Sequence, residues 1–546
     1  MTKRIFRLGV LLGVVGALAC STAPATRPVA SDAPAPTPTP SAMVRLNPNI
    51  VEETETYFVE RIPKADVYKV DDRHIKHPLV GPPVEFFKED AEYYYIHLPK
   101  RIPEEEAALR QQETESPSPS LAPMEPTPAI PATTDPAVSA ADFADLTPAR
   151  APASRLRLEE VASTGLPAGG MWRSSFSLAD VNGDKVPDIV SPPARIGGST
   201  PRIWTGDGQG RFKDYPIRFT EGGAARPDFS VSYGAVAVGD VDGDGHSDLV
   251  SASHAAGLVS LFGDGQGAFS VVRRGLPGRD FSAQAVVLVD ANGDGKLDLV
   301  ASRDIVPSEG EVDRQQVRLY VFRDRTRGWD FSPEGLVGGF YSNSLHAWDH
   351  DGDRKQDLLT GSHYVGALTL LWKSDGKGAF SAAPFPAIEP YAYHFATAPG
   401  SFGRERIPAF ADAYMMIAAG EKAMRATGIS VYSYRAGAWS RHRVWRKKEG
   451  NSLMYTVVMG DLDGDGLDDL VFPDSEERRL RVFFQNRDGS FVEAAREAEP
   501  ALNSPGQHAR IADLNGDGRL DVVLAKTVSS TSPEDPGGWS VYLNRR

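Results

Sequence analysis

One nine-residue pattern of acidic residues and glycine occurs six times in this 546-residue chain. Each copy has Asp at positions one, five and nine, Asp or Asn at position three, and Gly at position four. The side-chain oxygens at positions one, three, five and nine, with the backbone carbonyl oxygen at position seven, can converge on one hard cation. A donor set made only of oxygen, with several carboxylates, favours Ca²⁺ over Zn²⁺ or Mg²⁺. The copies are residues 180–188, 240–248, 290–298, 349–357, 461–469 and 513–521.

We therefore predict about six Ca²⁺ sites, one in each loop. Gly at position four, joined in four loops by Gly at position six, lets the backbone turn tightly around an ion; Lys185 and Arg354 occupy position six in the other two loops. Two alternatives are Asp/Gly-rich turns without ions and EF-hands, but no helices flank these loops and no Glu stands at position twelve. The predicted ligands are Asp180, Asn182, Asp184, Val186, Asp188, Asp240, Asp242, Asp244, His246, Asp248, Asp290, Asn292, Asp294, Lys296, Asp298, Asp349, Asp351, Asp353, Lys355, Asp357, Asp461, Asp463, Asp465, Leu467, Asp469, Asp513, Asn515, Asp517, Arg519 and Asp521.

The segments that flank the loops read as β-strands. A short apolar run precedes each loop and an apolar doublet such as Leu249-Val250 follows it, so each copy is a strand–loop–strand hairpin. The copies recur roughly every 50 to 60 residues, which indicates a repeat architecture. The gap between Asp349 and Asp461 spans two repeat lengths, and the downstream strands number seven. The fifth unit, roughly residues 391–446, has Arg404-Glu405-Arg406 in place of the acidic pattern, and we expect it to lack an ion.

This arrangement of loops and strands resembles the FG-GAP/VCBS repeat family, whose calcium-loop blades also build the β-propeller of integrin α subunits. The resemblance covers roughly residues 155–546 and implies an all-β fold, a seven-bladed β-propeller with Asp-rich calcium loops. The last unit lacks its fourth strand, and residues 156–167 resemble the fourth strand of another unit, residues 269–277. We expect this N-terminal segment to complete the last blade and close the ring.

The propeller geometry also predicts two faces. The metal loops join the first and second strands of their blades, so all six lie on one face, and residues five to nine positions earlier lie towards the opposite face. Aromatic residues around a channel mouth suit a sugar or peptide ligand; alternatively, they plug the channel or pack between blades. The candidate ligand-binding residues are Trp172, Arg173, Tyr233, Phe281, Tyr341, His346, Tyr393, His394, Tyr455 and His508.

The N-terminus reads as a secretory signal. Residues 1–19 contain Lys3, Arg4 and Arg7 and then a short apolar run, as in signal peptides. Cys20, the only cysteine, stands where a bacterial lipoprotein carries its lipid, and this resemblance implies a cell-envelope protein, with Ser21 compatible with the outer membrane. The alternative is a plain signal peptide with an incidental cysteine. A single cysteine cannot form an internal disulfide, so calcium is the available cross-link.

Composition divides the remaining chain. Residues 20–43 form a Pro-rich tether and residues 113–154 a Pro/Ser/Thr linker, both expected to be extended and at least partly disordered. Residues 44–112 are aromatic and charged, and a short helix is expected to begin at Pro103. This segment could dock on another envelope protein, lie as a strap on the propeller, or form a small independent fold. Residues 155–546 form the propeller.

Charge and motifs narrow the function. The formal net charge is −14, which six Ca²⁺ ions would largely offset, and no basic stripe suggests nucleic-acid binding. The sequence has no H-E-x-x-H, G-x-S-x-G or Walker motif. We predict a non-catalytic, calcium-stabilised outer-membrane lipoprotein, facing the periplasm or the outside, that binds or scaffolds a surface protein or polysaccharide in adhesion or envelope assembly. Alternatives are a carbohydrate-active enzyme such as a polysaccharide lyase, because separate blades can assemble an active site, and a structural part of a larger envelope machine.

Overall fold

The structure is a computed structural model, and it describes two parts of the chain. In the first part it describes only the strands between residues 50 and 99. In the second part it describes residues 143–546 except 173–174, 194–199, 221–233, 254–256, 279–280, 304–316, 334–335, 337–343, 362–370, 384–388, 390–391, 419–423, 451–453 and 529–534. Cys20, the tether of residues 20–43 and the helix expected from Pro103 lie outside the described residues.

The chain divides into two compact units, residues 1–134 and 135–546. The first contains two antiparallel sheets, of four strands in the order β1-β2-β7-β6 and of three strands in the order β3-β4-β5. The strands are β1 (Ile50–Glu53), β2 (Tyr57–Pro63), β3 (Tyr68–Asp71), β4 (His74–His77), β5 (Val80–Glu85), β6 (Lys88–Glu89) and β7 (Tyr93–Pro99). The aromatic segments Tyr57-Phe58 and Tyr93-Tyr94-Tyr95 thus belong to β2 and β7, which pair along their whole length.

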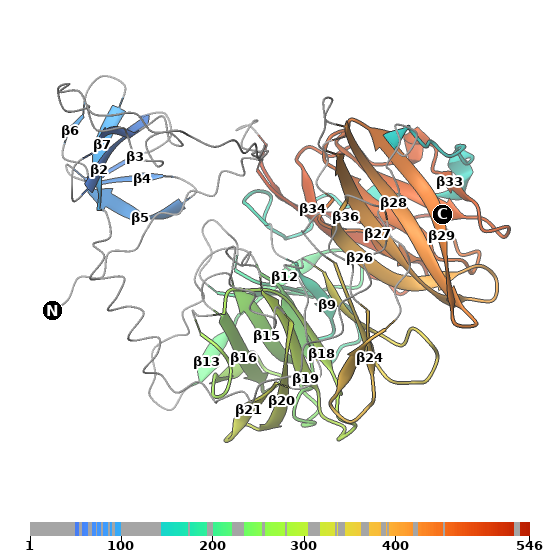
Figure 1. Ribbon diagram of the computed structural model, residues 1–546, viewed down its shortest axis with the longest axis horizontal. Coiled ribbons are helices and arrows are strands. Elements are labelled where there is room, and N and C mark those ends of the chain that lie inside the picture. Colours follow the sequence, from blue (N-terminus) through green and yellow to red (C-terminus); the bar gives the residue numbers. More distant parts are fainter. Residues whose placement is uncertain are drawn as a thin grey trace, which may run out of the picture. The chain divides into compact units, whose positions relative to one another are not determined.

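The second unit is an all-β, seven-bladed β-propeller (Figure 1). Blade 1 comprises β9 (Ser177–Ala179), β10 (Asp188–Ser191), β11 (Arg202–Gly206) and β12 (Phe212–Tyr215). Blade 2 comprises β14 (Val236–Gly239), β15 (Asp248–Ser253), β16 (Gly257–Gly263) and β17 (Ala268–Val272), with β13 (Arg218–Thr220) added beside β17. Blade 3 comprises β18 (Ala283–Val289), β19 (Asp298–Arg303), β20 (Val317–Asp324) and β21 (Gly328–Ser332), and blade 4 comprises β22 (Leu345–Trp348), β23 (Asp357–Thr360), β24 (Leu371–Ser374) and β25 (Phe380–Ala382). Blade 5 comprises β26 (Ala392–Phe402), β27 (Ile407–Ala418), β28 (Met424–Arg435) and β29 (Ala438–Lys448). Blade 6 comprises β30 (Val458–Gly460), β31 (Asp469–Asp474), β32 (Arg479–Gln485) and β33 (Phe491–Glu493). Blade 7 comprises β34 (Gly506–Ala512), β35 (Asp521–Lys526), β36 (Gly538–Asn544) and β8 (Leu158–Glu160).

The helices among the described residues are short 3-10 turns, η3 (Ala153–Arg155) and η4 (Arg496–Ala498). Within the described part of the chain, no helix is long and apolar enough to cross a membrane.

The sheets hold together by burying both faces of their central strands. Every residue of β15, β31 and β32 is buried, and each strand contains a short apolar segment: Leu249-Val250 in β15, residues 470–472 in β31 and residues 482–484 in β32. Apolar side chains of neighbouring blades share common cores; Val471 and Phe484 of blade 6, for example, cluster with Val522 and Tyr542 of blade 7. Packing between blades is therefore the main apolar stabilisation of the ring.

The ring closes as the sequence predicts. β8, from the N-terminal end of the propeller, pairs antiparallel with β36, with Glu160 opposite Tyr542. The N–H of Val161 also donates to the carbonyl of Val541 at 2.9 Å. The first strand of each blade lies beside that of the next blade, and β34 lies beside β9. The first and the last strand of the propeller thus lie in one blade, and β8 covers the edge that β36 would otherwise expose.

Blade 5 differs from the others in its strand lengths. Its four strands have 11 or 12 residues each, and Figure 1 shows them extending well beyond the short strands of blade 4. Residues 143–154, which composition assigned to a linker, run along blades 5 and 6. Phe143 is buried against Tyr414 and Met416, and the N–H of Ala151 donates to the carbonyl of Glu493 at 2.7 Å. We call residues 143–154 the strap.

Candidate metal loops and central channel

The six acidic loops all occupy the same place in their blades. Each connects the first strand to the second, and we number it after its blade: metal loop 1 (180–188), 2 (240–248), 3 (290–298), 4 (349–357), 6 (461–469) and 7 (513–521). Because the first strands run in the same direction around the ring, all six loops lie on one face, as expected. Blade 5 has the short turn Gly403–Arg406 between β26 and β27 instead, and this turn contains Arg404-Glu405-Arg406 in place of the acidic pattern.

Each metal loop is folded around its own carboxylates. In metal loop 6, Asp461 accepts hydrogen bonds from the N–H groups of Gly464 at 2.8 Å and Gly466 at 2.9 Å. Asp463 and Asp465 accept from the N–H groups two residues further on, at 3.1 and 3.0 Å. The same four bonds recur in the other five loops. The identical backbone is therefore a property of the residue pattern.

Positive φ angles explain the glycine positions. Gly at position four has φ between 71° and 81° in every loop, a conformation that favours glycine. Lys185 and Arg354 at position six both have φ of 69°, close to the 82–89° of the glycines at that position elsewhere. These two loops thus keep the same turn at a cost of about 1 kcal/mol each.

The Asp at position nine is buried and ties three strands together. In metal loop 2, Asp248 accepts from the N–H of Val241 at 2.9 Å and from the N–H of Gly263, on the third strand, at 2.9 Å. Burial raises the pKa of Asp248 to about 7, although both hydrogen bonds oppose the shift. Burial likewise raises the pKa of Asp298 and Asp521 to about 6. A cation close to these carboxylates would favour their charged form.

The carboxylates converge as a metal site requires. In metal loops 2, 4 and 6, three carboxylate oxygens lie within 4.8 Å of one another. These are the three loops with Asp at position three; loops 1, 3 and 7 have Asn there. The side-chain donors are all oxygen atoms. The residues present therefore fit a hard cation such as Ca²⁺.

Basic side chains neutralise the loops that carry the extra acid. Arg325 contacts Asp242 and, at 2.5 Å, Asp244 in metal loop 2. Metal loops 4 and 6 receive equivalent contacts at positions three and five from Lys373 and Arg155, respectively. In metal loops 1 and 7 the Asn at position three itself donates to the position-five carboxylate, at 2.9 and 3.1 Å. A cation or an amide thus satisfies the outer oxygen of position five in five of the loops.

Hydrogen bonds connect the metal loops to neighbouring blades. The Ser247 hydroxyl of metal loop 2 donates to the carbonyl of Asp180 at 3.1 Å, and the Asn544 side-chain amide of blade 7 donates to the carbonyl of Leu462 at 2.6 Å. The turn of blade 5 joins this chain of contacts because the Arg406 guanidinium donates to the carbonyl of Gly466 at 2.9 Å. Whatever fixes a metal loop therefore also fixes the contact between blades.

Metal loop 4 contains a histidine that sequence reasoning missed. His350 at position two is buried, whereas the other loops have an apolar residue there. Its Nδ1 contacts the carboxylate of Asp357, and its ring stacks near Trp439 of blade 5, with ring centroids 6.4 Å apart. His350, Asp351 and Asp357 place ligand atoms within 4.8 Å of one another. The signal in the sequence was the one polar residue at a position that is otherwise apolar.

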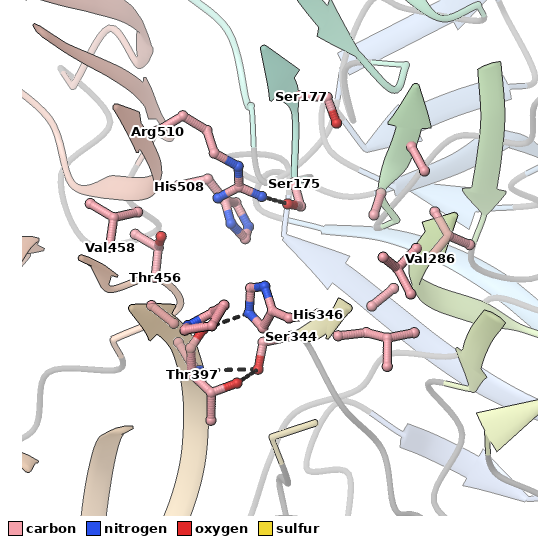
Figure 2. Close-up of a pocket in the computed structure, with 18 of the residues that line it drawn as sticks. Ser175, Ser177, Val286, Ser344, His346, Thr397, Thr456, Val458, His508 and Arg510 are labelled. Atoms are coloured by element: carbon pink, nitrogen blue, oxygen red, sulfur yellow. Dashed lines mark hydrogen bonds between the residues drawn. The ribbon is translucent and has the colours of Figure 1, made fainter. Parts of the chain in front are cut away.

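The central channel contains a cavity of about 420 Å³. Residues from the inner ends of all seven blades line it, which follows from the closed ring of first strands. Three of the predicted ligand-binding residues, His346, Tyr455 and His508, are among its lining residues, and Figure 2 shows His346 and His508 there. The Arg510 guanidinium also lies in the cavity and donates to the hydroxyl of Ser175 at 2.5 Å. Sequence reasoning missed Arg510, although a charged residue in an innermost strand was a usable signal.

The other predicted ligand-binding residues lie elsewhere. Trp172 is buried between blades 1 and 7 with Trp204 and Trp539, at centroid distances of 5.5 and 5.3 Å. Phe281 is fully buried beneath the guanidinium of Arg318, 4.6 Å from its ring centroid. These two aromatics pack in the positions that the alternative interpretation assigned to them.

Blade 5 supplies two more members of the predicted set. His394 is buried and shares a 2.7 Å hydrogen bond with Asp412. Tyr393 is half-buried and stacks on Phe395. Three further members, Arg173, Tyr233 and Tyr341, lie outside the described residues. The ligand-binding role of the set stays a prediction.

Comparison with protein families identifies the repeats. Residues 240–301 and 461–524 each match the FG-GAP-like repeat model, and each match begins at a metal loop and includes the next one. The chain therefore carries FG-GAP-like repeats in a seven-bladed β-propeller. Comparison with curated proteins finds no match.

Comparison with solved structures matches two crystal structures of BBS1N in complex with ARL6DN, one soaked with mercury and one with lead. They share 9% and 11% sequence identity with this chain, and both have a TM-score of 0.40. The matches cover 71% of this chain and 97% and 96% of those chains.

Proposed function

We propose that this chain is a non-catalytic binding or scaffold module of the bacterial cell envelope, stabilised by about six Ca²⁺ ions. One observation carries the calcium assignment: six loops repeat the same carboxylate-centred backbone at the same place in six blades. The predicted signal and Cys20 support an outer-membrane lipoprotein, facing the periplasm or the outside. A surface protein or a polysaccharide is the expected partner, in adhesion or envelope assembly.

The residues of each loop would hold the ion in defined roles. Side-chain oxygens at positions one, three, five and nine and the carbonyl at position seven would be the ligands. When bound, the ion supplies positive charge that offsets the repulsion between these carboxylates. The position-nine Asp connects the site to the first three strands of its blade, as Asp469 does through the N–H groups of Leu462 and Gln485. Ion binding at a loop would therefore stabilise the blade and, through Ser247 and Asn544, its neighbours.

A propeller held in this way suits binding better than a flexible domain would. Rigid elements place surface groups with little loss of conformational entropy when a partner binds. The predicted tether of residues 20–43 would separate the propeller from the membrane anchor and let it reach a partner.

Thermal unfolding in calcium and in chelator tests the proposal. The mature chain is expected to unfold at a clearly higher temperature in millimolar CaCl₂ than in EGTA, because a ligand that binds only the folded state stabilises it, by about 2.7 kcal/mol per site at 100 times Kd. Asp461→Asn should reduce the difference, and Asp488→Asn, in an exposed turn outside the metal loops, should leave it unchanged. The same melting temperature in both buffers would refute the calcium assignment.

A pull-down from solubilised envelope with the lipidated protein tests the binding role. A partner recovered in calcium and lost in EGTA supports a binding module whose surface depends on the ion-stabilised ring. Equal recovery in both buffers would count against calcium-dependent recognition.

A further inference from the structure

The walls of the central cavity differ in chemistry around the ring. Blades 2 and 3 contribute residues 235–238 and 285–288, which are all Ala, Val or Leu. Blades 1, 4 and 7 contribute hydroxyls, imidazoles and one guanidinium, including Ser175, His346 and Arg510. Figure 2 shows Arg510 and His508 on one side of the cavity and Val286 on the other. A ligand that fits both walls has one polar end and one apolar end.

Arg510 gives the polar wall a positive charge. Its guanidinium donates to the carbonyl of Ala509 at 2.9 Å and to the hydroxyl of Ser175 at 2.5 Å, and it lies 5.6 Å from the centroid of the Phe176 ring. These partners are neutral. Burial lowers the pKa of Arg510 to about 10, so the side chain still carries its proton at pH 7.

The described residues that line the cavity provide no opposite charge for Arg510. Among the described residues that line it, none is Asp or Glu. Charges removed from water in proteins are normally paired with an opposite charge, because an unpaired charge costs several kcal/mol. His346 does not add a second charge: its Nε2 bonds the carbonyl of Thr397 at 2.6 Å, and burial, followed by the charge of Arg510, lowers its pKa to about 4. Arg510 therefore gives the polar wall a positive charge at neutral pH to which His346 adds none.

The charge, the shape and the volume together select a class of ligand. A guanidinium presents two parallel N–H donors that match the two oxygens of a carboxylate. One negative charge balances Arg510, whereas a doubly charged phosphate would leave a second charge facing apolar residues. The cavity of about 420 Å³ lies within the range of small-molecule sites, roughly 300 to 1,000 Å³.

We propose that the central channel binds a small organic monocarboxylate, whose carboxylate pairs with Arg510 and whose apolar body lies against the wall around Val286. The hydroxyl of Ser175 holds the guanidinium in place for this contact, and His508 lies beside it (Figure 2). This site is additional to the metal loops, and it goes beyond the envelope role proposed above. It gives the propeller a soluble ligand of its own.

Calorimetric titration of the mature chain in CaCl₂ tests the channel site, with hexanoate as the probe. Hexanoate is expected to bind, and hexan-1-ol and inorganic phosphate are expected to bind at least tenfold more weakly, since each lacks one of the two features. Arg510→Met should weaken hexanoate binding at least tenfold. Arg157→Met, which changes an exposed arginine, should leave it unchanged. No hexanoate binding to the unaltered chain at millimolar concentration, or equal binding to the Arg510→Met variant, would overturn the proposal.

A second variant keeps the test independent of folding. Ser175→Asp places a carboxylate on the side chain that already contacts Arg510, so it should occupy the guanidinium and abolish hexanoate binding without lowering the melting temperature. Phosphate binding as tight as hexanoate binding would overturn the monocarboxylate class and indicate a simple anion site.

Discussion

Arg325 offers a test of how the acidic loops are balanced. Its guanidinium bridges positions three and five of metal loop 2, and the three side chains in this contact, Arg325, Asp242 and Asp244, are 39%, 14% and 35% exposed. We expect Arg325→Met to destabilise the propeller in EGTA and to have little effect in CaCl₂. In chelator the arginine is the nearby positive charge, whereas in calcium the ion takes over this role.

The magnitude follows from the exposure and spacing of the groups. Partly exposed ion pairs contribute about 0.2 to 1 kcal/mol each, and two such contacts therefore contribute roughly 0.5 to 2 kcal/mol. The repulsion that the arginine offsets is large enough for this, since two carboxylates such as those of Asp240 and Asp242, within 4.8 Å of each other, repel by about 3.5 kcal/mol or more at an effective dielectric constant near 20, before relaxation. Met retains most of the packing against Phe262, over which the guanidinium lies at 5.1 Å, so the charge is the main change.

Urea unfolding measures the effect in both buffers. The free energy of unfolding should fall by about 0.5 to 2 kcal/mol in EGTA and by less in calcium. Arg327→Met is the matched control, because Arg327 lies two residues away, is 74% exposed and pairs with Asp324 outside the loop. In an Asp242→Asn background, which makes metal loop 2 like the three loops with Asn at position three, Arg325→Met should lose its effect. An equal loss of stability in EGTA and in calcium would show that Arg325 is a structural brace, and the charge-balance reasoning would be refuted.

Two further predictions concern the channel and the strap. Burial, and then the charge of Arg510, lowers the pKa of His346 to about 4. Because the ordinary value is about 6.5, the folded state binds fewer protons than the unfolded state between these two pH values. The free energy of unfolding should therefore fall as the pH drops from 6.5 towards 4, by up to about 3 kcal/mol. Urea unfolding at pH 7.5 and pH 5 should show a smaller loss for His346→Gln than for the unaltered chain, and an identical loss would contradict the assignment. Phe143→Ala should lower the free energy of unfolding by about 3 to 5 kcal/mol, since Phe143 is 1% exposed and large-to-small core changes cost this much. Thr147→Ala, at an exposed position of the same strap, should have little effect. If Phe143→Ala lowered the free energy of unfolding as little as Thr147→Ala does, the strap would contribute no stability.

The fold and the loop geometry were predictable because both are local. The bond between Asp461 and the N–H of Gly464 involves residues three positions apart, so the pattern determines it wherever the loop occurs. Ring closure was predictable for a related reason, since residues 156–167 read as a missing fourth strand and β8 fills that place. Repetition provided the signal in both cases.

Contacts between blades were not predictable in the same way. Arg155 reaches metal loop 6 from more than 300 positions away in sequence, and its role depends on where the closing segment lies. The aromatic residues before the loops could not be divided between channel and core from spacing alone. Tyr455 lines the cavity and Trp172 is buried, although both lie at a similar distance in sequence before a metal loop. Arg510 was not predicted because it lies three positions before Asp513, outside the window of five to nine positions from which most of the candidates were taken.

Blade 5 is the blade without an acidic loop, so the proposed calcium sites give it no ion of its own. In the other blades the position-nine Asp connects the first three strands, as Asp248 does in blade 2, and other contacts must connect the strands of blade 5. The strands of blade 5 are 11 or 12 residues long and pair along most of that length, which adds backbone hydrogen bonds and apolar contact. Its short turn also contacts the next metal loop through Arg406 and Asp468 at 3.1 Å. Blade 5 is thus held in place partly by metal loop 6 of the neighbouring blade. We expect the stability of blade 5 to depend on metal loop 6 more than on any site of its own.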